Sequence, residues 1–188
     1  MAVTWNSVFT AIADEQDVSA TISYAPGTTI RGIFVIVLTP THTDDRITGV
    51  TFGGVALARV AFALDATGEP GGAVVYFLGA GIPAGTNNVI VSVGGAATQL
   101  RGVIGSVLAA DDTEIADSDI IQADQANPQI TLDTGASDAA VAAGLYSGTG
   151  SVPSGIAGQT QIQSDDFGAH ITVSTQRTAI ESGSITIG

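Results

Sequence analysis

The sequence predicts an all-β fold, an antiparallel β-sandwich of the jelly-roll type. Short runs of β-branched and aromatic residues recur along the 188 residues, and clusters of Gly, Pro, Asn and Thr separate them. Such runs predict strands and such clusters predict turns. No segment with helical periodicity is long enough to propose a βαβ unit. Many short strands at this spacing are typical of a sandwich or a barrel.

The expected strands occupy residues 18–24, 32–38, 47–52, 55–63, 72–78, 86–93, 100–108, 129–132, 138–146, 158–163, 169–175 and 183–187. Segment 1–17 is expected to be an N-terminal arm or an edge extension. Residues 18–188 are expected to form one sandwich domain with a long acidic loop at 110–128. The Ala-rich stretch 137–148 could also form a helix, but Gly144 interrupts it and we favour a strand.

The clearest hairpin is "ITGVTFGGVALARV", residues 47–60. Gly53 and Gly54 can take the positive φ angles that a two-residue primed turn requires. With that turn, four apolar side chains share one face of the hairpin, as a hairpin that faces a core requires. The pairs expected across the hairpin are Phe52 with Val55, Val50 with Leu57, and Thr48 with Arg59.

The charge of the chain excludes several partners. Five Arg and no Lys stand against 18 acidic residues, which gives a net charge of −13. Because nucleic-acid affinity depends on Lys and Arg that displace counterions, neither nucleic acid nor an anionic membrane is an expected partner. Only 12% of residues are charged while 45% are hydrophobic, which indicates that partners cover part of the surface. An Ala- and Gly-rich monomer with a tight core is the alternative.

Targeting signals are not evident. The N-terminal residues "MAVTWNSVFT" have no basic region followed by an apolar one, so no signal peptide is expected. The longest apolar run, at 32–38, is too short to span a bilayer. The chain is therefore expected to be soluble and made in the cytoplasm. It has no Cys, so disulfides and thiolate chemistry are excluded.

Catalytic and nucleotide-binding motifs are not convincing. "GAGIPA" at 79–84 fits the dinucleotide pattern, but a strand rather than a helix follows it, and the motif needs the helix to hold pyrophosphate. A triad would need a His placed between an acid and a Ser, and paired carboxylates could serve a glycosidase. We interpret all of these as ordinary loop or strand-end residues and predict no catalytic residue. The residues considered were His42, His170, Asp44, Asp45, Asp165 and Asp166.

The acidic stretch 110–128 holds six of the 18 carboxylates. A calcium loop needs alternating oxygen ligands, a Gly for the turn and a closing Glu. Asp117 and Asp119 have the alternation, but no Gly and no closing Glu accompany them. A solvated loop is the favoured interpretation, with these two residues as the calcium candidates, and no cofactor is expected.

Two stretches, 47–60 and 74–93, resemble a family of β-sandwich domains found in phage virion proteins and phage-like bacterial surface proteins. The family's pattern is an aromatic-Gly-Gly-Val-x-Leu hairpin, an aromatic-Leu strand, a Pro-x-Gly-Thr turn and a Val-x-Val strand. Segments 137–148, 157–163 and 181–188 are also similar to its later strands. Where the family carries Phe-x-Gly-Val-Asp, this chain has "VLAADDTEIADSD". The matching residues are Phe52, Gly53, Gly54, Val55, Leu57, Tyr76, Leu78, Pro83, Gly85, Thr86, Val89 and Val91.

The resemblance implies a non-enzymatic virion structural protein. We expect a capsid decoration (cement) protein of a tailed bacteriophage that binds the major capsid protein on the outer surface of the shell. It would act as a homo-oligomer, and a trimer suits a shell's local threefold positions. Trp5 and Phe9 are expected to anchor an N-terminal arm to a neighbour. The alternatives are a phage tail or fibre component, a carbohydrate-binding β-sandwich module and, third, an enzyme.

Overall fold

The structure is a computed structural model of the whole chain. It describes residues 4–5, 10–17, 19–39, 44–64, 72–95, 98–109, 130–134, 140–147, 160–166, 170–177 and 183–187. Side chains are described only at 10, 12, 19–39, 44–64, 72–95 and 99–107.

The described residues form strands joined by turns and loops, and none of them lies in a helix. The strands are β1 (Thr4–Trp5), β2 (Thr10–Asp17), β3 (Ser19–Tyr24), β4 (Gly32–Leu38), β5 (Ile47–Phe52), β6 (Val55–Ala56), β7 (Ala58–Leu64), β8 (Gly72–Leu78), β9 (Asn87–Val93), β10 (Thr98–Ala109), β11 (Ile130–Thr134), β12 (Ala140–Ser147), β13 (Thr160–Asp166), β14 (His170–Arg177) and β15 (Gly183–Ile187).

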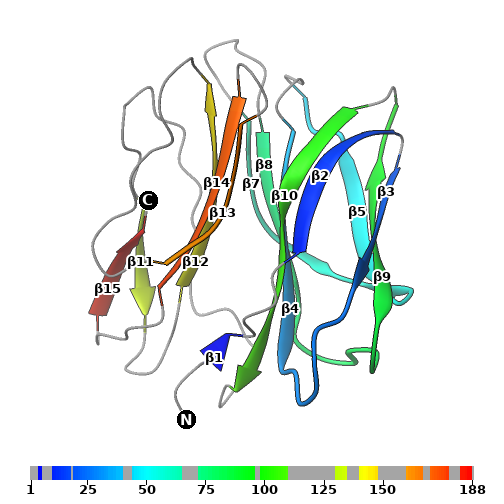
Figure 1. The fold of residues 1–188 in the computed structure, drawn as a ribbon, viewed down its shortest axis with the longest axis vertical. Coiled ribbons are helices and arrows are strands. Elements are labelled where there is room, and N and C mark those ends of the chain that lie inside the picture. The colour runs from blue at the N-terminus through cyan, green and yellow to red at the C-terminus, as the bar shows by residue number, and fades with distance from the viewer. Residues whose placement is uncertain are drawn as a thin grey trace.

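Two antiparallel sheets make the sandwich. The middle sheet has the order β1-β10-β4-β8-β7, with β2 also paired to β10, and the outer sheet has the order β3-β9-β5-β6. A third, C-terminal sheet of β12-β14-β13 lies on the other side of the middle sheet, next to the β11–β15 pair (Figure 1). The predicted all-β, antiparallel β-sandwich is confirmed, and the sequence did not lead us to expect the third layer.

The main core fills the space between the middle and outer sheets. Alternation of apolar residues explains it: Val89, Val91 and Val93 of β9 all point inward, and the first two are fully buried. Tyr24 of β3 and Phe52 of β5 are also fully buried, and their rings meet edge to face with centroids 6.3 Å apart. An edge-to-face pair of this kind adds about 0.5–1.5 kcal/mol beyond the area it buries.

Strand β4 is buried on both faces, and this places the third layer. Its "GIFVIVL" residues are all buried, because one face lines the main core and the other faces the C-terminal sheet. On that second face Phe34 and Ile36 form a smaller cluster with Val103, and Val75 and Phe77 pack against it. A strand covered on both sides has a continuous apolar run rather than alternation.

The hairpin prediction is correct at its turn and wrong at its base. Gly53 and Gly54 have φ angles of 55° and 84°, and Phe52 pairs with Val55. Leu57 donates its N–H to the carbonyl of Val50 at 2.9 Å, as expected for residues that face each other.

After Leu57 the chain leaves the outer sheet and enters the middle sheet as β7. Arg59 therefore pairs with Tyr76 of β8 and not with Thr48.

Three other predictions concern the N-terminal segment, the Ala-rich stretch and the acidic stretch. Segment 1–17 contributes β1 and β2 to one edge of β10, and the domain division at residue 17 stays a prediction. Segment 137–148 contains β12, so the strand interpretation is confirmed. The acidic stretch 110–128 lies outside the described residues.

Candidate functional site

The residues that the sequence singled out lie mostly outside the described part of the structure. Trp5 belongs to β1, where its backbone pairs with Val107, but its side chain is not described. Phe9, Asp117 and Asp119 lie outside the described residues altogether. The arm and the calcium site therefore stay predictions.

Of the two histidines considered for a triad, the structure describes only His170. His42 lies outside the described residues. His170 is the first residue of β14 and pairs with Ser147 of β12, while Asp165 and Asp166 end β13 on the opposite side of β14.

Asp44 and Asp45 lie directly before β5, and each forms an ion pair with an arginine. Arg46 Nε lies 2.9 and 2.8 Å from the two carboxylate oxygens of Asp44. Arg59 Nη1 lies 2.7 Å from Oδ2 of Asp45. The other oxygen of Asp45 accepts the backbone N–H of Ile47 at 3.2 Å. These partly exposed pairs each contribute at most about 1 kcal/mol, and the Asp45–Arg59 pair connects the start of β5 with β7.

Phe62 is the only large apolar side chain that is exposed among the described residues, at 39%. The guanidinium carbon of Arg59 lies 4.2 Å from the centre of its ring, a cation–π contact. A β-bulge at Val60 makes this contact, because it shifts the register with β8 between Arg59 and Ala61. The bulge places Arg59 and Phe62 on the same face of the strand.

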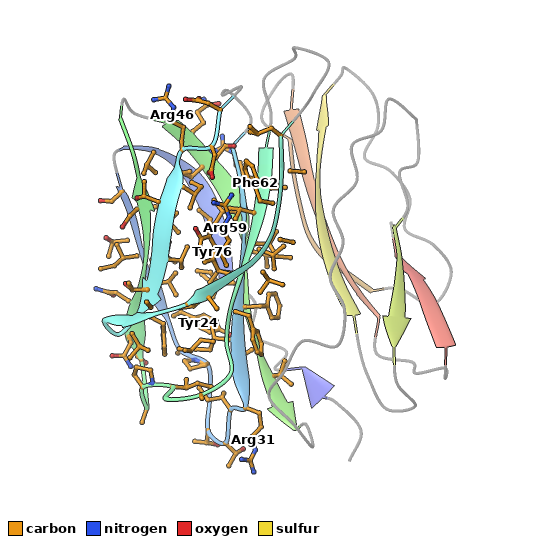
Figure 2. The ribbon with its side chains drawn as sticks, turned by 180° about the vertical axis from the view of Figure 1, so that it is seen from behind. Tyr24, Arg31, Arg46, Arg59, Phe62 and Tyr76 are labelled. Carbon is orange, nitrogen blue, oxygen red and sulfur yellow. The ribbon has the colours of Figure 1, made fainter. Side chains whose placement is uncertain are left out.

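We name Asp45, Arg59, Phe62 and Tyr76 the margin cluster, since they lie where β7 forms the edge of the middle sheet. Figure 2 shows Arg59, Phe62 and Tyr76 beside one another on the side of the sheet that faces the outer sheet. Arg46 lies at the upper end of the sandwich in this view, and Arg31 lies at the lower end.

Tyr76 is the buried member of the margin cluster. Its hydroxyl donates to the carbonyl of Ile47 at 3.5 Å. Burial raises the pKa of Tyr76 above its ordinary value; the charge of Arg59 lowers it and that of Asp45 raises it. Because burial is the largest cause, the phenol stays protonated at neutral pH.

A second set of polar side chains forms hydrogen bonds inside the main core. The Tyr24 hydroxyl donates to Oγ of Ser106 at 2.9 Å, and Ser106 donates to the carbonyl of Pro26 at 3.2 Å. Burial raises the pKa of Tyr24, and the hydrogen bond to Ser106 lowers it. Since Tyr24 is on β3 and Ser106 on β10, these bonds link the two sheets inside the core, where hydrogen bonds are strong.

Arg101 is the third notable polar side chain. It is 2% exposed and donates from Nη1 to the carbonyl of Leu100 at 3.0 Å. As a neighbour of Val103 on alternate positions of β10, it points toward the C-terminal sheet. A buried guanidinium is costly unless its surroundings compensate the charge.

The described polar groups include ion pairs and neutral phenols, and the Asp45–Arg59, Tyr76–Ile47 and Tyr24–Ser106 contacts connect segments of the outer and middle sheets. Among the described residues, no three or more His, Cys, Asp or Glu side chains gather where they could hold a metal ion. The part of the chain that the structure describes also holds no helix long and apolar enough to cross a membrane.

Sequence reasoning missed the margin cluster and the Tyr24–Ser106 bond. The exposed Phe62 had no signal in the sequence, because strand alternation alone would put it and Arg59 on opposite faces. Tyr24 and Ser106 are 82 positions apart, and only the sheet topology brings them together.

Comparison with known proteins found no matching protein family, no matching curated protein and no matching solved structure.

Proposed function

We propose that the chain is a non-enzymatic virion structural protein, a capsid decoration protein that binds the outer surface of a phage shell. The observation that supports this most is the placement of the motif residues that resemble those of phage virion domains. Phe52 is buried in the core, and Gly53, Gly54 and Gly85 have positive φ angles in turns. These motif residues therefore lie in the core and in the turns of the sandwich, which are the roles that the resemblance implies for them.

The mechanism is adhesion to an assembled surface. A protein that binds only the assembled shell stabilises it by mass action, in proportion to the logarithm of its concentration over its Kd. The net charge of −13 keeps decorated particles apart by repulsion. Copies associate with one another in a closed oligomer, with three copies matching the local threefold axes of a shell. Trp5 and Phe9 anchor the N-terminal arm to a neighbour.

The test is the copy number of the protein in purified particles, measured by quantitative mass spectrometry against the major capsid protein. Copies close to the number of shell subunits, which one trimer at every local threefold position would give, agree with decoration. A few copies per particle would replace decoration with a tail or fibre role. Absence from particles would refute the virion proposal in both forms.

One observation favours a carbohydrate-binding module as the second candidate. Sugar-binding surfaces use exposed aromatic rings beside hydrogen-bonding charged groups, and Phe62 has Arg59 and Asp45 beside it. However, the guanidinium of Arg59 already covers part of that ring, so a sugar has only the remaining surface for stacking. Binding to a glycan array that Phe62→Ala abolishes would establish this candidate over adhesion to a shell.

A further inference from the structure

The outer edge of β7 has the backbone groups that another strand needs. Among the described residues, β7 pairs only with β8. Gly72 exchanges both of its backbone hydrogen bonds with Thr39, at 2.9 and 3.2 Å, so its N–H and C=O point away from β7. In an antiparallel pair, the residue opposite such a position also directs both groups away from the shared ladder.

This fixes which residues of β7 face outward. Leu64 is opposite Gly72, and Phe62 is opposite Val74, two positions further along β8. The backbone N–H and C=O of Leu64 and Phe62 therefore both point to the outer edge of the sheet, while those of Ala63 bond to β8. An edge with such groups is a template for a further strand.

The side chains of the edge strands distinguish β7 from the others. Natural proteins protect edges with charged residues, and β2 has Asp14, Glu15 and Asp17. The two longer edge strands whose side chains are described throughout are β3 and β7, and neither has an acid. β3 presents exposed Ser and Thr, whereas β7 reads "ARVAFAL" and presents Phe62. Its one charge, Arg59, is already paired with Asp45.

We propose that β7 pairs antiparallel with β7 of a second copy of this chain across a twofold axis at Ala63. Phe62 then forms a hydrogen-bonded pair with Leu64 of the second copy, and the reverse, so all outward groups of these residues are used. The small Ala63 side chains meet at the axis, where a close non-hydrogen-bonded pair needs little room. Two chains of charge −13 repel each other less at a strand without an acid, such as β7, than at the acidic β2.

This contact rests on the self-association in the proposed function and names its surface. The β7 contact has twofold symmetry, so it is distinct from the contacts around the threefold axis of the proposed trimer. It joins one trimer to the next.

A single cysteine tests the axis directly, since the chain has no cysteine of its own. At a non-hydrogen-bonded pair the two Cα atoms lie about 4.5 Å apart, within the range for a disulfide. Ala63→Cys should therefore give a covalent dimer on mild oxidation. Ala61→Cys is the matched control, because four residue steps of about 3.4 Å each separate the two copies of position 61. We expect roughly tenfold more dimer from Ala63→Cys than from Ala61→Cys, because only the former meets disulfide geometry.

A second pair of variants tests the edge without a covalent bond. Phe62→Pro removes an outward N–H of β7 that takes no part in the ladder with β8, a position where Pro is tolerated. Thr21→Pro does the same on β3, whose partner strand is β9. The carbonyl of Asn88 on β9 accepts its hydrogen bond from the N–H of Gly53, so Ser23, which lies opposite Asn88, directs its backbone groups to the outer edge. Thr21 is two positions from Ser23 and does the same. Sedimentation equilibrium should show a lower average mass for Phe62→Pro and an unchanged mass for Thr21→Pro, with circular dichroism showing that both are folded.

The outcomes separate this inference from the proposed function. Equal crosslinking of the two cysteine variants, or an unchanged mass for Phe62→Pro in a chain that still associates, would overturn the β7 contact and leave self-association standing. A wild-type chain that is monomeric at every concentration would overturn both. Decoration of particles is measured separately by copy number.

Discussion

Gly102 of β10 is the position where one added methyl group should cost the most. Its φ angle is 144°, and a Cβ built there would lie 1.9 Å from the carbonyl oxygen of Ile36 on β4. Real Cβ atoms essentially never come within 3.0 Å of such an atom, so in Gly102→Ala the two strands must separate locally by about 1 Å. That displacement exceeds the range of N–H···O distances in a ladder, so neighbouring bonds between β10 and β4 break.

The expected loss follows from these contacts. About two buried backbone hydrogen bonds at about 1–2 kcal/mol each, with about 1–3 kcal/mol for an L-residue in a sparsely populated backbone region, give a loss of about 3–7 kcal/mol. A typical domain has only about 5–15 kcal/mol in total. At about 2–4 °C per kcal/mol for a chain of this size, the Tm should fall by about 6 °C or more.

Gly49→Ala on β5 is the matched control. It is also a strand glycine, but no atom lies within 4 Å of its added Cβ. Its free energy of unfolding should rise by about 0.4–1 kcal/mol, because alanine restricts the unfolded chain. Urea unfolding followed by circular dichroism compares the two. A Gly102→Ala variant within about 0.5 kcal/mol of the wild type, the range of ordinary surface substitutions, would refute the reasoning about the β10–β4 contact.

Three further predictions concern the core and the margin cluster. Phe52→Ala should lower the free energy of unfolding by about 3–5 kcal/mol and Phe62→Ala by at most about 1 kcal/mol, since the first ring is fully buried and the second is 39% exposed; equal losses in urea unfolding would contradict this. A double-mutant cycle of Asp45→Ala and Arg59→Ala should give a coupling of about 0.2–1 kcal/mol that decreases in about 1 M salt, and a coupling that salt leaves unchanged would argue against a partly exposed pair. Burial raises the pKa of Tyr24, so its neutral form contributes stability that is complete below the unfolded phenol's pKa of about 10 and is lost as pH rises through the folded pKa. The free energy of unfolding should therefore fall less at alkaline pH in Tyr24→Phe than in the wild type. Parallel curves for the two proteins would show that Tyr24 does not carry this linkage.

The turns and core alternation could be predicted from the sequence because they depend on local chemistry. Gly53 and Gly54 supply φ angles that other residues resist, and the valines of β9 reveal their face by spacing alone. The exit of the chain from the outer sheet at Leu57 could not be predicted. "VALARVAFAL" is apolar apart from Arg59, and which sheet a strand joins depends on pairing with the distant β8.

The margin cluster was unpredictable for a related reason. Arg59 and Phe62 are three positions apart, which places residues on opposite faces of a regular strand. The bulge at Val60 inverts that relation, and bulges have no firm sequence signature. In contrast, the burial of β4 on both faces did have a signal: "GIFVIVL" has no polar position to face solvent.

The third layer changes how adhesion can work in this molecule. The C-terminal sheet covers Phe34 and Ile36, which would otherwise make an apolar face on the middle sheet. Within the described residues, Phe62 is then the only large apolar group left at the surface, too small an area to hold a partner by the hydrophobic effect alone. Backbone groups at a sheet edge do not depend on apolar area, and they select a partner by register. For a chain with few charged residues, whose described large apolar side chains other than Phe62 are at least partly buried, β7 is therefore the part of the described surface best suited to specific association.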